Sequence, residues 1–190
     1  MSGTRDRVVM FVDVQNVHIT FEKIGQEVRY DVLLKAVEDQ YRRRGKVLFK
    51  AVAFVPMFEG DERREKLINA LSFMGYRVVT KVVKKIGDAS SHKINMDIEM
   101  AMEIISMADS VDEVVLVTGD RDFVPIVDYL SKRGKRVRVI GTRKGAVSID
   151  LIRACDEYDN MDEIEGILMP FRYSEHYREG QQDEEYSPDL

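Results

Sequence analysis

The chain has 190 residues, of which 44% are hydrophobic and 33% charged, and its net charge is −5. This length suits one domain with a full core, and no apolar run is long enough to span a bilayer, so we predict a soluble protein without a membrane partner. The single cysteine, Cys155, excludes an internal disulfide, and the three histidines lack zinc-ligand spacing. Residues 1–13 lack the pattern of a secretory signal, which predicts a cytoplasmic protein.

Short apolar runs alternate with segments of helical period along the chain. The apolar runs predict five strands, at 7–13, 47–55, 76–83, 113–119 and 136–141. Apolar residues at every third or fourth position predict helices at 31–44, 61–75, 93–108 and 122–134, with a short one over 148–158. This alternation predicts an α/β fold with a mostly parallel five-stranded sheet and helices on both faces.

The end of the chain has a different composition from the rest. Residues 169–190 are mostly polar or acidic and show no apolar periodicity. We therefore predict one domain over residues 1–168, followed by a disordered tail over residues 169–190.

Carboxylates follow two of the predicted strands. Asp13 ends the first strand, with Asn16 one turn further on, and Asp120 and Asp122 follow the fourth strand in the stretch VVLVTGDRDF. If the strands are ordered third, second, first, fourth, fifth, both groups face one cleft at the carboxyl edge of the sheet. Asp97, near the start of the helix before the fourth strand, joins the same edge. Taken singly, Asp13 and Asp122 are more simply explained as helix caps or turn formers.

Acids from three segments that meet at one edge repel one another and raise one another's pKa, and a hard divalent cation relieves this repulsion. Oxygen ligands without Cys or His favour Mg²⁺ or Mn²⁺. Such a metal activates a water and offsets the charge that develops on a phosphodiester. The acids therefore predict phosphodiester hydrolysis, and the predicted ligands are Asp13, Asp97, Asp120 and Asp122.

Four stretches of the chain share the pattern of a known family. They are FVDVQNV, KINMDIEMAMEII, VVLVTGDRDFVPIVDYLSKRGKRVRVIG and SIDLIRACDEY. Together they resemble the NYN domain of the LabA-like group, within the PIN-like nuclease superfamily, over roughly residues 7–165. The resemblance implies a Rossmann-like three-layer sandwich with a metal-dependent ribonuclease site.

The resemblance also implies roles for single residues. The four predicted ligands fall on the family's acidic positions, and Asn16 falls on the polar residue of its first motif, so all five are candidate catalytic residues. The family often has a further acid within the central helix, for which Glu103 is the candidate. Lys93 stands further from Asp97 than the family's lysine does from its helix acid, so either the helix starts differently or Lys93 serves only in capping or phosphate binding.

An RNA substrate needs groups that hold its backbone. Lys85 and Lys93 lie on the polar loop before the acid-bearing helix, and Arg143 follows the fifth strand on the same rim. Arg121, between two acids, either pairs with one of them or reaches a phosphate, and Thr118 can bond a backbone group or a metal-bound water. Lysines beside a strand end are equally well explained as solvated charges. The expected partner is RNA in single-stranded form.

Two other functions stay open at this stage. A haloacid dehalogenase-like phosphatase also has a strand that ends in Asp and a later GD…D motif, but Gln15 replaces its second acid here. A non-catalytic member of the same fold would bind RNA or a protein partner. Met and Ile lie on more than one face of residues 94–107, and a homodimer would bury the part that the core does not cover.

Overall fold

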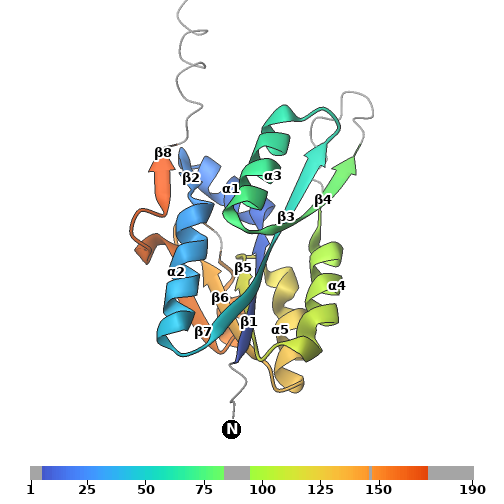
Figure 1. Cartoon of the computed structure of the whole chain (residues 1–190), viewed down its shortest axis with the longest axis vertical. Coiled ribbons are helices and arrows are strands. Elements are labelled where there is room, and N and C mark those ends of the chain that lie inside the picture. Colours follow the sequence, from blue (N-terminus) through green and yellow to red (C-terminus); the bar gives the residue numbers. More distant parts are fainter. Residues whose placement is uncertain (1–5, 84–94, 146, 171–190) are drawn as a thin grey trace, which may run out of the picture.

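The computed structural model describes residues 6–83, 95–145 and 147–170. Within these ranges six strands form one parallel sheet in the order β4-β3-β1-β5-β6-β7 (Figure 1). In sheet order the strands are β4 (Arg77–Val83), β3 (Val47–Phe58), β1 (Arg7–Asp13), β5 (Glu113–Val117), β6 (Arg136–Gly141) and β7 (Glu157–Asn160). The central strands β1 and β5 are continuous apolar runs because helices cover both faces of a parallel sheet.

The helices divide between the two faces of the sheet. One face packs against α1 (Val14–Glu22), α2 (Tyr30–Arg43) and α3 (Glu62–Met74). The other packs against α4 (Asp97–Met107), α5 (Val124–Lys132) and α6 (Ile149–Ala154). Short 3₁₀ helices occupy η1 (Ala108–Ser110), η2 (Arg121–Phe123) and η3 (Met161–Glu163). No helix in the described ranges combines the length and the apolar character needed to cross a bilayer.

The α/β fold with a Rossmann-like sheet is confirmed, and so is the order of the five predicted strands. The prediction of only five strands is wrong, because residues 148–158 do not form one helix. They form α6, which ends at Ala154, and then enter the edge strand β7 at Glu157. The strand sequence EYDN has no apolar alternation, so periodicity does not reveal it.

A second, two-stranded sheet also escaped prediction. The strand β2 (Gln26–Val28) pairs antiparallel with β8 (Leu168–Pro170), which brings the end of the described chain back beside α1. The folded part thus extends two residues past the predicted boundary at 168. The rest of the predicted tail, 171–190, lies outside the described residues.

A buried arginine holds the edge strand β7 to the sheet. Arg138 on β6 is 1% exposed, and its guanidinium bonds to Asp159 on β7 and lies over the ring of Tyr41, 5.6 Å from the centroid. The Tyr41 hydroxyl donates to Oε1 of Glu113 at 2.5 Å. Burial raises the pKa of Tyr41, so this phenol stays a neutral donor. These contacts give the buried side chains of Arg138 and Glu113 hydrogen-bonding partners inside the protein.

We expect Arg138→Ala to lower the free energy of unfolding by about 3 kcal/mol, because it leaves the Asp159 carboxylate without its partner beside a buried void. Urea unfolding measures this difference. Arg136→Ala is the matched control: Arg136 is exposed at the start of the same strand, and its loss should change stability by less than about 0.5 kcal/mol. Equal effects of the two substitutions would contradict the role of Arg138.

Candidate metal centre

The carboxyl ends of β1 and β5 lie side by side at the centre of the sheet. The two strands pair in parallel, with Val12 opposite Val117, so Asp13 and Thr118 leave the sheet at the same level. After β1 the chain enters α1 on one face, and after β5 it enters η2 and α5 on the other. A crevice opens at such a reversal of strand order, and it is the usual ligand site of an open α/β sheet.

Three carboxylates meet at this crevice. Asp97, Asp120 and Asp122 each place one carboxylate oxygen within 4.8 Å of the others. Asp97 is the first residue of α4, while the other two belong to the turn after β5. A small cleft beside them is lined by Asp13, Gln15, Asn16, Asn95, Asp97 and Asp120. The structure therefore brings three of the predicted ligands together and places Asp13 on the wall of the same cleft.

Short-range hydrogen bonds fix the positions of Asp120 and Asp122 in the turn after β5. Oδ1 of Asp120 accepts from the backbone N–H of Asp122 at 3.0 Å, so Asp120 caps η2. Phe123, the next residue, is buried in the core and anchors the turn. The simpler explanation of Asp122 as the cap of the following helix is wrong, because the N-cap residue of α5 is Phe123.

Asp13 lies in a surrounding that disfavours its charged form. Burial is the largest cause that raises its pKa, to about 6, and the carboxylates of Asp97 and Asp120 add to this effect. Two hydrogen bonds oppose the rise: Oδ1 accepts from the Asn16 backbone N–H at 3.0 Å, and Oδ2 accepts from the Thr118 hydroxyl at 3.3 Å. A raised pKa beside like charges and an all-oxygen set of donors fit a hard divalent cation.

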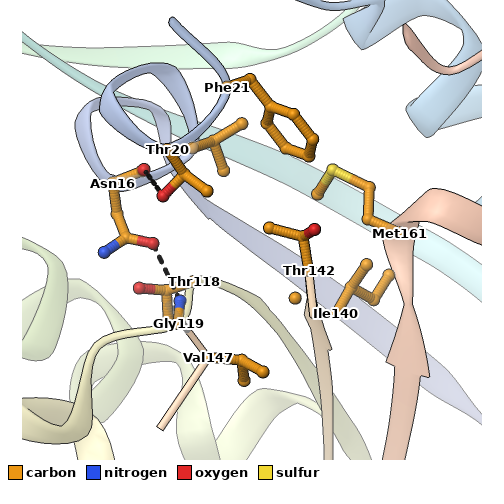
Figure 2. Close-up of a pocket in the computed structure, with 11 residues that line it drawn as sticks. Asn16, Thr20, Phe21, Thr118, Gly119, Ile140, Thr142, Val147 and Met161 are labelled. Atoms are coloured by element: carbon orange, nitrogen blue, oxygen red, sulfur yellow. Dashed lines mark hydrogen bonds between the residues drawn. The ribbon is translucent and has the colours of Figure 1, made fainter. Parts of the chain in front are cut away.

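Asn16 and Thr118 connect the two halves of the site (Figure 2). Oδ1 of Asn16 accepts from the backbone N–H of Gly119 at 2.9 Å, and its carbonyl accepts from the Thr20 hydroxyl at 2.8 Å. Thr118 is 1% exposed, and its hydroxyl also accepts from the Asp120 backbone N–H at 3.2 Å. These hydrogen bonds connect α1 to the turn after β5, next to Asp13 and Asp120. The catalytic role of Asn16 and the substrate-binding role of Thr118 stay predictions.

The sequence model of the NYN domain matches residues 7–162 of this chain. The chain belongs to the NYN domain family. It is 30% identical over 174 residues to the low amplitude and bright protein LabA of Synechococcus elongatus, covering 88% of this chain and 90% of LabA. A crystal structure of a protein of unknown function from Vibrio parahaemolyticus is also similar, with 26% identity and a TM-score of 0.74 over 89% of this chain and 99% of that one. The predicted resemblance to LabA-like NYN domains is confirmed.

The cationic residues predicted to bind substrate are spread around this NYN domain. Arg121 is 73% exposed and lies 3.6 Å from Asp150 on α6, so it turns to α6 and not to the acids that flank it. Arg143 is exposed beyond the carboxyl end of β6. Lys85 and Lys93 lie outside the described residues.

Two polar residues on or just before the central helix α4 make contacts that the sequence did not predict. Glu103 forms an ion pair with Arg77 on β4 and is not part of the three-carboxylate cluster. Asn95, which sequence reasoning missed, donates from Nδ2 to Oδ2 of Asp97 at 2.6 Å. An Asn two residues before a helical run is a typical local capping signal, and it could have identified this residue.

We expect Asp13→Asn to stabilise the metal-free NYN domain at pH 7. The folded-state pKa of about 6 exceeds the usual value of 3.8, so between these pH values only the folded state holds the proton, and stability falls as pH rises. Above pH 6 the ionised group destabilises the protein by roughly 1–3 kcal/mol. Asparagine carries no charge, so this destabilisation is absent, and its side-chain oxygen can still accept the cap hydrogen bond from the Asn16 backbone N–H.

Urea unfolding in EDTA at pH 4 and pH 7 measures the effect. The gain in unfolding free energy from Asp13→Asn should be large at pH 7 and small near pH 4, where the folded carboxyl is protonated and the unfolded one is close to half protonated. A gain of equal size at both pH values would show that the charge of Asp13 is not its cause.

Proposed function

We propose that this NYN domain is a metal-dependent ribonuclease that hydrolyses RNA phosphodiester bonds at the carboxyl edge of its sheet. The observation that carries the proposal is the group of three carboxylates within 4.8 Å of one another, next to an Asp13 with a raised pKa. The NYN family, within the PIN-like nucleases, supports RNA as the substrate class. Membership in this family also removes the reason for considering a haloacid dehalogenase-like phosphatase.

The ligands proposed for Mg²⁺ or Mn²⁺ are Asp97, Asp120 and Asp122, with Asp13 as a further ligand or proton acceptor on the cleft wall. When bound, such an ion lowers the pKa of a water and offsets the charge on the scissile phosphate. The ligand atoms that this cluster offers are carboxylate oxygens, which favours these hard cations over zinc.

The remaining steps belong to the side chains of the protein. With a pKa near 6, Asp13 is ionised at neutral pH and has the basicity suited to accept a proton from an attacking water. Asn16 and Thr118 keep Asp13 and Asp120 in fixed relative positions. Arg121 and Arg143, exposed on the same rim, are the described residues proposed to contact phosphates of the bound strand.

The test is cleavage of an end-labelled, mixed-sequence single-stranded RNA with Mn²⁺, with Mg²⁺ and with EDTA. Asp120→Asn should reduce the rate at least about 100-fold, because it removes one of the clustered carboxylates. In EDTA the free energy of unfolding of this variant should not be lower than that of wild type, since the substitution reduces the repulsion between the clustered carboxylates. Asp128→Asn, an identical change at an exposed position on α5, is the matched control and should cleave normally.

Two results would contradict the proposal. One is cleavage that persists in EDTA, and the other is an Asp120→Asn protein as active as wild type. RNA binding without cleavage, in a protein that still binds Mn²⁺, would instead support a non-catalytic member of the family.

A further inference from the structure

Asp97 is held at two points, its carboxylate and its backbone N–H, by the residue two positions before it. Nδ2 of Asn95 donates to Oδ2 of Asp97, and the backbone N–H of Asp97 donates to Oδ1 of Asn95, both at 2.6 Å. The two ends of one amide group therefore bond to one acidic residue. This pairing restricts the rotation of the Asp97 side chain and, with it, the direction of its second oxygen.

Asn95 is anchored in turn to the edge strand β4. Nζ of Lys81 donates to the backbone carbonyl of Asn95 at 3.2 Å and lies 2.8 Å from Oε1 of Glu99. Lys81 thus contacts residues on both sides of Asp97, two positions before it and two after it.

The start of α4 depends on these contacts for its position. Its N-cap residue, Met96, makes no side-chain capping bond within the described part of the chain, so Oδ1 of Asn95 supplies an acceptor for the first turn. Met96 and Met100 are buried in the core and hold this turn against the sheet. Packing of the two methionines fixes the distance of α4 from the sheet, while the polar contacts fix the direction of the Asp97 carboxylate at its start.

We propose that Asn95 and Lys81 are positioning residues that hold Asp97 in the geometry with which the three carboxylates bind a divalent cation. The inference rests on the proposed function, because it requires a metal at Asp97, Asp120 and Asp122. Partners that hydrogen-bond a metal ligand orient it, and their removal typically weakens metal affinity 10–100-fold. Neither residue touches the substrate in this proposal. Both act through Asp97.

The test is calorimetric titration of the full chain with Mn²⁺. Asn95→Ala removes both bonds to Asp97 and should raise the dissociation constant about 10–100-fold. Lys81→Met removes the anchor of Asn95 and should raise the dissociation constant by a smaller factor, about 3–10-fold. Lys81→Arg keeps a cationic donor, so its dissociation constant should stay near that of wild type. RNA cleavage by Asn95→Ala should recover at high Mn²⁺, because the defect lies in metal affinity.

Arg77→Met is the matched control. Arg77 lies four residues before Lys81 on β4 and pairs with Glu103 further along α4, so this change removes a similar strand-to-helix ion pair without touching Asn95. It should leave Mn²⁺ affinity unchanged. Unfolding midpoints in EDTA show whether any variant has lost its fold.

The results separate the two proposals. If wild type binds Mn²⁺ and Asn95→Ala and Lys81→Met bind it equally well, the positioning role is wrong and the proposed function stands. The positioning role is also overturned if Arg77→Met weakens binding as much as Lys81→Met does. If wild type binds no Mn²⁺, or Asp120→Asn binds it as tightly, the proposed function fails and the positioning role fails with it.

Discussion

The parallel pairing of β1 with β5 is the constraint on which the rest of the site depends. Because the strand order reverses there, the chain leaves β1 toward one face and β5 toward the other, and a crevice opens between them. Asp13 and Asp120 lie on its two sides, and the turn that carries Asp120 also carries Asp122. Asp97 comes from another segment, at the start of α4, which contacts β1 in the sheet.

Charge is arranged differently at the two edges of the sheet. Toward the amino edge the buried charges have opposite partners: Arg138 pairs with Asp159, and Glu113 pairs with Lys46. At the carboxyl edge carboxylates face one another, and burial raises the pKa of Asp13. Paired charges stabilise a fold, whereas crowded like charges destabilise it unless a cation binds. The contrast marks the carboxyl edge as the candidate site independently of the family match.

The sequence predicted those features that follow from local pattern. Five apolar runs identified five strands, and their order followed from the rules for parallel sheets. The family motifs identified the acids that the structure brings together. The edge strand β7 was missed because EYDN is stabilised by a partner on β6, Arg138, and not by its own apolar residues. Strands β2 and β8 were missed for a related reason, since three residues each are too few for periodicity to show.

The sequence by itself determined the fold class, the family and the acids at the strand ends, because hydrophobic period and motif spacing are properties of the chain alone. Tertiary structure decided which of these acids lie close enough together to bind one ion and which line the wall of the cleft beside them. It also showed that Thr118 bonds to Asp13 and that Arg121 lies beside Asp150. It also revealed the contacts of Asn95 and Lys81 with Asp97 and Glu99. Such contacts join strands and helices distant along the chain, and their distances exist only once the elements have packed.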